Sequence, residues 1–210
     1  MKAEDVGGGQ AAKLNKHEIR SKATRRALLD GAEKIFFRDG FELAQIDAIA
    51  EEAGRTRGAV YAHYESKAHL FLSVIERRMQ ETHDRGKIFM AKETAAGLSE
   101  REAFRKYYIK LYEPAWAILM LEFKLYALRH PSELKKLRRM FKELLNLSVS
   151  DALYEMGPHA SRLSKEVRFS GLMSMVSAVV LDMYFDPDVM TLQKARVLLG
   201  GVFDGLVSEG

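Results

Sequence analysis

The sequence QIDAIAEEAGRTRGAVYAHYESK, residues 45–67, decides the fold of this chain. It begins with Ile46, Ile49 and Ala50, which are apolar at the i, i+3, i+4 spacing of an amphipathic helix. Gly54 then interrupts the pattern, where a tight turn between helices needs a residue that tolerates positive φ. The stretch therefore predicts a short helix followed by a tight turn.

A second short helix is predicted directly after Gly54. Its Ala59 and Val60 are small or apolar, and the positions around them carry cations, hydroxyl groups and aromatic rings. Two short helices joined by a glycine turn, the second with a polar outer face, are typical of a helix-turn-helix, which places its second helix in the DNA major groove. We predict this motif over residues 45–64.

These residues also carry a resemblance to a known family. The run AGRTRGAVYAHYESKAHLF resembles the DNA-binding domain of the TetR (tetracycline repressor) family of regulators. The positions that match are Ala53-Gly54, Gly58, Tyr61, His63 and Ser66-Lys67, and the segment from Thr24-Arg25 to Gly40-Phe41 resembles the family's first helix. The likeness covers residues 22–82. It implies a three-helix DNA-binding domain followed by a helical domain for ligand binding and dimerisation.

The composition indicates a cytoplasmic globular protein. Of the 210 residues, 47% are hydrophobic and 30% are charged, and none is cysteine, which excludes disulfides and thiolate metal sites. No secretory signal is visible. The least polar run, Gly171 to Phe185, contains Asp182 and is shorter than the roughly 20 residues of a membrane-spanning helix. We therefore expect no membrane partner.

The first residues form a basic arm in the sequence. Within residues 13–26 a single acid, Glu18, stands against six cations: Lys13, Lys16, Arg20, Lys22, Arg25 and Arg26. We predict a flexible arm over residues 1–21. Two readings stay open, because such cations either neutralise DNA phosphates or belong to a solvated tail.

Helical patterns continue through the rest of the chain, and no alternation of β-branched residues predicts a strand. Predicted helix starts and ends are Gly40, Ser66, Pro114, Pro131 and Gly157-Pro158, and the last two helices fall at residues 160–184 and 188–207. The prediction is an all-α chain of about nine helices. Its DNA-binding domain spans residues 22–82, and its effector-binding and dimerisation domain spans residues 83–210.

The candidate DNA-contacting residues are Gln45, Arg55, Thr56, Arg57, Gly58, Ala59, Tyr61, His63, Tyr64 and Lys67. The planar fork of Arg57 suits a guanine edge or a pair of phosphates. Lys67, in the first turn of the next helix, is predicted to bind phosphate together with the amides there. Gln45 stands where relatives usually have a hydroxyl residue. For His63, the alternative to DNA contact is a purely structural role.

The last two helices carry small residues at helical spacing: Gly171, Ser174 and Ala178 in one, Gly201 and Gly205 in the other. An interior glycine costs a helix about 1 kcal/mol relative to alanine, so close helix packing is the expected compensation. The resemblance implies a dimer interface of four helices, and packing within one chain is the alternative.

The helix from Pro114 carries Trp116, Met120, Phe123 and Tyr126 on or near one face. By composition such a stripe is a core face. The resemblance implies that it lines a pocket for a small hydrophobic or aromatic effector. Glu122 and Arg129 are the candidates to orient a charged group of that effector.

Together these features predict a ligand-responsive, sequence-specific transcriptional regulator, a homodimer that an effector releases from a palindromic operator. We expect the regulator to act as a repressor, and an activator is the alternative within this class. The alternative outside DNA-binding regulators is a helical adaptor that binds protein and has no sequence-specific DNA binding. The chain has no catalytic motif, and its six histidines lack metal-ligand spacing, so we expect no enzyme, metal or cofactor.

Overall fold

The computed structural model describes residues 15–111, 114–154 and 163–207. Within these ranges every regular element is a helix, as predicted, and there are nine. They are α1 (Lys16–Leu43), α2 (Ile46–Glu52), α3 (Arg57–His63), α4 (Lys67–Ala95), α5 (Glu100–Tyr108), α6 (Pro114–Arg129), α7 (Pro131–Tyr154), α8 (Lys165–Phe185) and α9 (Leu192–Leu206). The predicted helix end at Gly157-Pro158 lies outside the described residues.

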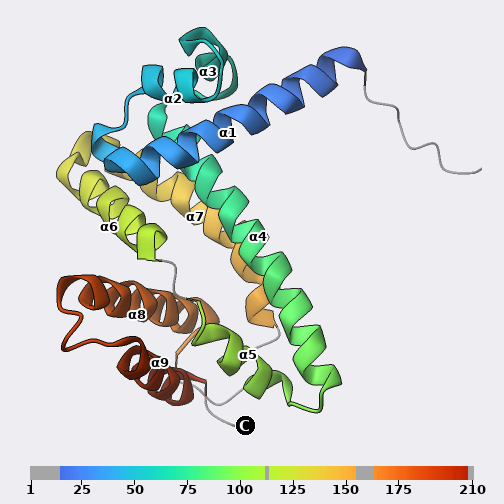
Figure 1. Cartoon of the computed structure of the whole chain (residues 1–210), viewed down its shortest axis with the longest axis vertical. Helices are drawn as coiled ribbons and strands as arrows, with labels where there is room; N and C mark the ends of the chain where they lie inside the picture. The colour runs from blue at the N-terminus through green and yellow to red at the C-terminus, as the bar shows by residue number, and fades with distance from the viewer. Residues whose placement is uncertain (1–14, 112–113, 155–162, 208–210) are drawn as a thin grey trace, which may run out of the picture.

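The nine helices form two connected groups (Figure 1). Helices α2 and α3 lie on α1 at one end of the molecule, and α8 and α9 pack together at the other end. The long α4 runs from the first group toward α5, and α6 packs against both α1 and α8. The predicted domain boundary at residue 82 therefore falls inside α4, which serves both groups.

The start of α1 corrects the predicted flexible arm. Asn15 and Glu18 form a capping box, in which each side chain accepts a hydrogen bond from the other residue's backbone N–H. Helix therefore begins at Lys16, and residues 16–21, predicted as part of the arm, are its first turns. The earlier part of the predicted arm, residues 1–14, lies outside the described residues.

Gly40 marks the end of regular helix in α1. Its φ of +76° lies in the left-handed region, which only glycine adopts at little cost. The prediction of a glycine helix end is confirmed here. After Gly40 the chain makes one further turn, Phe41 to Leu43, before α2 begins.

One apolar core joins the end of the molecule that holds α2 and α3 to the rest of the chain. Its centre is a set of aromatic rings from three helices: Phe36 and Phe41 from α1, Phe71 from α4 and Phe123 from α6. Phe71 and Phe123 stack with ring centroids 5.1 Å apart, and Phe41 meets both rings edge-on. A movement of α6 therefore acts directly on the helices that carry the helix-turn-helix.

A second core lies among α5, α8 and α9. Leu172, Leu199 and Phe203 are fully buried there beside Tyr108. The Tyr108 hydroxyl donates a 2.9 Å hydrogen bond to the carbonyl of Leu172, and burial raises the pKa of this phenol well above its usual range. This core fixes α8 and α9 against α5.

Helix α8 is unusually apolar. From Val167 to Phe185 it has 19 residues with a mean hydropathy of 1.3, and 28% of that stretch is buried. By length and composition it could cross a membrane, and this apolar run is longer than the predicted one, Gly171 to Phe185. The same test is passed by core helices of soluble proteins, so it is weak evidence for a membrane span.

Candidate nucleic-acid interface

Helices α2 and α3 are held in place by their inner residues. Ile49 and Val60 are buried, and Gly54 turns the chain between them with a φ of +60°. The amide of Arg55 then donates a 2.8 Å hydrogen bond to the carbonyl of Ala50, which closes the turn. The outer face of α3 is thereby presented on a rigid base, away from α1.

The first turn of α3 leaves its backbone open. The Thr56 hydroxyl oxygen accepts a 3.2 Å hydrogen bond from the amide of Ala59 and so caps the helix, as predicted for one of its roles. A Cβ added to Gly58 would touch only this hydroxyl, at 3.8 Å. A flat surface such as a groove wall can therefore approach this turn closely.

Arg57 is an exposed arginine at the start of α3. Its Nη1 lies 2.7 Å from the carboxylate of Asp47 in α2, and its guanidinium lies 5.5 Å from the ring centroid of Tyr61. Both members of the ion pair are exposed, 59% and 66%. Asp47 and Tyr61 thus hold the guanidinium fork at the surface, where it can meet a base edge or a phosphate.

The remaining predicted contact residues of the motif divide by exposure. Gln45 and Arg55 are exposed and bond to nearby carbonyls, of Leu43 at 3.2 Å and of Gly54 at 2.8 Å. Ala59 and His63 are half-buried. Both arginine and glutamine side chains keep further N–H groups for a partner.

Tyr64 is a correction to the predicted site. Its side chain is 1% exposed, and its ring meets His69 edge-on at 5.6 Å. Burial raises the pKa of its phenol, although the nearby Arg25 guanidinium acts in the opposite direction. Because Tyr64 is a core residue of this domain, it does not face DNA.

Lys67 has a structural role that the sequence did not predict. Its ammonium donates to the carbonyls of Glu42, at 2.8 Å, and Ala44, at 3.1 Å, and lies 5.1 Å from the ring centroid of Phe41. Burial lowers the pKa of this lysine. Two of its three N–H donors therefore fasten the end of α1 to the start of α4, and one is left for a phosphate.

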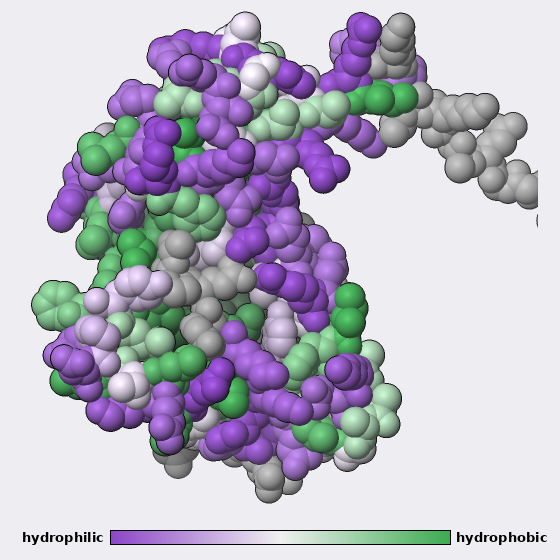
Figure 2. All heavy atoms as spheres, viewed as in Figure 1, coloured by the Kyte–Doolittle hydropathy of each residue, from purple (hydrophilic) through white to green (hydrophobic). Residues whose placement is uncertain are grey.

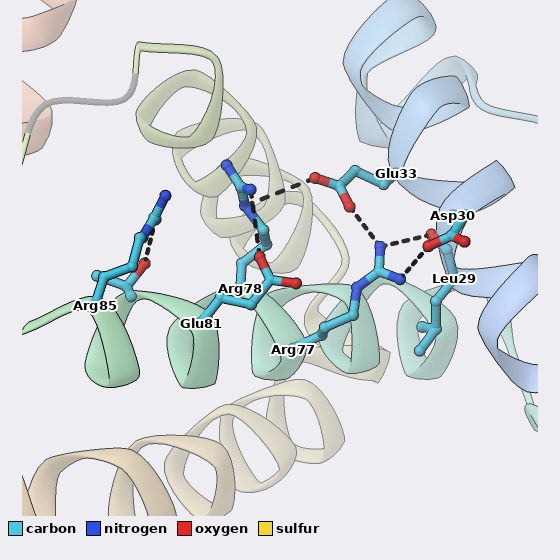
Figure 3. A network of polar contacts seen from close by, with 8 residues as sticks. Leu29, Asp30, Glu33, Arg77, Arg78, Glu81 and Arg85 are labelled. Atoms are coloured by element: carbon cyan, nitrogen blue, oxygen red, sulfur yellow. Dashed lines mark hydrogen bonds and ion pairs between the residues drawn. The ribbon is translucent and has the colours of Figure 1, made fainter. Parts of the chain in front are cut away.

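An ion-pair network fastens α4 to α1 on a neighbouring face (Figure 3). Arg77 pairs with Asp30 and Glu33 of α1, and Arg78 lies 3.6 Å from Glu33 and over the ring of Trp116. The charged residues of this network border an open groove of about 490 Å³, whose other lining residues include Lys22, Arg25 and Arg26. The pairing was not visible in the sequence, because its members are more than forty residues apart.

The predicted effector residues pack into the aromatic core between α1, α4 and α6. Trp116 meets Phe37 edge-on at 4.7 Å, Phe123 is buried against Phe71, and Tyr126 stacks on His130 at 4.0 Å. Met120 packs against the same cluster. None of the four lines the groove beside α1 or a second open groove, of about 640 Å³, beside α5 and α9.

Glu122 is a further correction. The sequence reading made it a candidate to orient an effector, but its carboxylate accepts a 2.9 Å hydrogen bond from the backbone N–H of Phe41. A Cβ added to Gly40 would lie only 2.6 Å from an oxygen of the same carboxylate. Glu122 thus fastens α6 to the end of α1. The other candidate, Arg129, is exposed at the end of α6.

The predicted interface residues of α8 and α9 lie mostly on an open face. Ser174, Ala178, Gly201 and Gly205 are exposed, and a Cβ on either glycine would meet nothing within 4 Å. A Cβ on Gly171 would instead lie 3.4 Å from Leu206 of α9, so this glycine serves packing within the chain.

Comparison with known sequences identifies the DNA-binding end. A family model described as "Bacterial regulatory proteins, tetR family" matches residues 28–74, which cover α2, α3 and parts of α1 and α4. The HTH-type transcriptional regulator TtgR of Pseudomonas putida is 39% identical over 61 residues, 29% of each chain. The HTH-type transcriptional repressor BepR of Brucella suis is 44% identical over 54 residues, 26% of each chain. The chain thus aligns with less than a third of these relatives' length.

Solved structures extend the likeness to the whole fold. A putative TetR-family transcriptional regulator from Rhodococcus sp. superposes with a TM-score of 0.64 at 16% identity, covering 89% of this chain and 100% of that one. A putative transcriptional regulator from Saccharomonospora viridis, in complex with choline, gives a TM-score of 0.63 at 16% identity, covering 90% and 100%. Residues 28–74 therefore match the DNA-binding domain of the tetR family of bacterial regulatory proteins, and the rest of the chain shares the fold of the solved structures.

Proposed function

We propose that this protein is a sequence-specific DNA-binding transcriptional regulator and that α3 reads the operator. The exposed Arg57, held at the surface of α3 between Asp47 and Tyr61, is the observation that carries the proposal. An arginine fork on a helix that fits the major groove is the commonest reader of guanine. Such a regulator acts in the bacterial cytoplasm, where the DNA is.

The basic first turns of α1 support binding to the DNA backbone. Arg20, Lys22, Arg25 and Arg26 are all exposed in the N-terminal part of α1, a helix whose first turns extend beyond the other helices in Figure 1. In this role they neutralise phosphates without reading sequence, and the binding then weakens as salt rises. Gln45, Arg55 and Thr56 supply further donors at the edge of the motif.

The protein acts as a homodimer through α8 and α9 in this proposal. Large apolar side chains are exposed on these helices and the loop between them, among them Tyr184, Val197 and Phe185, which is 87% exposed. Apolar atoms also gather around the end of α8 in the space-filling view (Figure 2). A two-fold dimer through this face covers that surface and presents two copies of α3 to a palindromic site.

A small hydrophobic or aromatic effector releases the repressor from DNA in the proposed mechanism. Release requires that the effector favours a conformation in which the two α3 helices no longer match the half-site spacing. The direct contacts of α6 with α1, through Glu122 and the aromatic core, support α6 as the route. Effector binding and DNA binding must then weaken each other by the same factor.

Selection of bound sequences from a random DNA pool at near-physiological salt tests the proposal. A recovered palindrome supports a dimeric sequence-specific regulator, and sequences no better than the starting pool contradict it. The adaptor alternative is separated by a salt titration, because a protein-only adaptor shows no salt-dependent affinity for DNA. An activator would be distinguished by transcription from a promoter that carries the recovered site.

A further inference from the structure

One charged side chain is buried in the part of the chain that the structure describes, and it belongs to Arg168 of α8. Its side chain is 5% exposed. Arg168, Leu172 and Val176 follow at intervals of four residues, and all three are buried. Arg168 therefore points inward with the apolar face of α8, toward the interior of the C-terminal half.

Among the described residues, the Arg168 side chain has no partner of the kind that a buried cation normally has. Its Nε–H has no hydrogen-bond partner, and no ion pair joins it to a carboxylate of the described residues. Two described acids of the neighbouring α6 and α9 are engaged elsewhere, Glu122 with Phe41 and Asp204 with two arginines of α5. Asp182, on the same helix, is exposed and lies about 21 Å further along the axis.

The face of α8 that carries Arg168 packs into an apolar core. The core on this face of α8 contains Tyr108, Leu172, Val176 and Phe203, and the hydroxyl of Tyr108 is already bonded to the carbonyl of Leu172. A buried N–H without a partner costs stability, and a counter-ion beside the guanidinium would offset that cost. A protein retains such a charge at little gain to its own stability, so a function in binding is the natural reason for it.

We propose that Arg168 binds the anionic group of the effector, and that the effector is an apolar molecule with one carboxylate or phosphate. The guanidinium fork matches either group with two parallel hydrogen bonds. Leu172, Val176 and Phe203 are buried in this core, so they would have to move apart to contact the apolar body. This inference rests on the proposed function and adds the chemical class of the effector. It also moves the effector's anchor from α6, where the sequence reading placed it, to α8.

Matched pairs of probes test the charge requirement. Octanoate and octyl phosphate carry the anion, and octanol has the same chain without it. For each probe, affinity is measured by calorimetry on the full-length protein. Wild type should bind the two anions at least about tenfold more tightly than octanol, since hydrogen bonds to charged groups are the strong ones.

The variant Arg168→Met should remove that preference and leave octanol binding unchanged. Arg168→Lys, which keeps the charge but loses the fork, should give an intermediate preference and serves if the methionine variant does not fold. Arg139→Met, at an exposed arginine of α7, is the matched control and should behave as wild type. The same proteins are tested for release from the selected operator, where octanoate should act on wild type and Arg139→Met only.

Two results would overturn the proposal. One is the absence of any preference for the anions in wild type. The other is an equal loss of octanol and octanoate binding in Arg168→Met, which would make Arg168 a structural residue. Failure of the proposed function is separate, since operator binding by the wild type is measured without any probe.

Discussion

The carboxylate of Glu122 in α6 accepts a 2.9 Å hydrogen bond from the backbone N–H of Phe41, 81 residues earlier in the chain. Phe41 directly follows Gly40, where regular helix in α1 ends. The same carboxylate occupies the space beside Gly40 that a Cβ would need. A glycine in α1 and an acid in α6 are thus fitted to each other at the junction between the two groups of helices.

Gly40→Ala should lower the free energy of unfolding by about 2 kcal/mol or more, because both the left-handed φ and the Glu122 carboxylate oppose a Cβ. Gly97→Ala is the matched control, since Gly97 also has a positive φ but nothing within 4 Å of the added carbon. Urea unfolding of both variants separates strain from crowding. Equal losses of unfolding free energy in the two variants would mean that the Glu122 side chain moves aside at no cost.

Arg57→Ala should weaken operator binding by about 1–3 kcal/mol and relax the preference at one base pair of each half-site. Asp47→Ala, which removes the ion-pair partner but leaves the fork, should keep the preferred sequence. Binding of each variant to a set of singly substituted operators makes the comparison. An unchanged sequence preference in Arg57→Ala would end the base-reading role.

Lys67→Met should lower both DNA affinity and the free energy of unfolding, since the ammonium holds two carbonyls at the end of α1. The loss of DNA affinity should be similar for all sequences, as for a phosphate contact. A stability loss of about 1–2 kcal/mol is expected in urea. Lys34→Met, at an exposed ion pair with Glu52, is the control and should change stability little. Full stability in Lys67→Met would contradict the fastening role.

Asp204→Asn should flatten the acid side of the stability profile. The hydrogen bond from Arg105 is the main cause that lowers the pKa of the Asp204 carboxyl below its ordinary 3.8. The lowered folded-state pKa means that the stabilisation is complete above that ordinary value and is lost as pH falls through the folded-state value. Since Asp204 is largely exposed, at most about 1 kcal/mol is expected.

Thermal unfolding of the Asp204→Asn variant and the wild type between pH 7 and pH 2 gives the measurement. The two proteins should differ at pH 7 and converge at the lowest pH. A difference that persists there would show that the asparagine acts through packing between α5 and α9 and not through charge.

Gly205→Leu should break the proposed dimer without unfolding the chain. A side chain at this position enters open space in the single chain, but it would collide with a second copy of the α8–α9 face. Sedimentation should show monomers, and the circular dichroism spectrum should keep its helical signal. Ala95→Leu, on an exposed position of α4 away from this face, should remain dimeric. An intact dimer in Gly205→Leu would place the interface elsewhere.

Local features of the sequence were sufficient for the fold class and the DNA-reading motif. Apolar spacing at Ile46 and Ile49, a glycine at residue 54 and the hydroxyl caps at Thr56 and Ser66 act within a few residues of one another. Such interactions are readable from the chain because helix turns and caps depend on neighbours three or four positions away. The same holds for the helix starts at Pro114 and Pro131.

Only the tertiary structure decided which polar groups meet. Helix spacing places Glu122 on a turn of α6 but cannot tell that its partner is the amide of Phe41, and it cannot show that Tyr64 is buried or that Lys67 bonds to α1. Arg168 looked like any arginine of a helix, and its burial depends on how α8 meets the helices around it. The physical reason is that burial and long-range pairing are set by packing between elements, whereas periodicity and capping are set within each one.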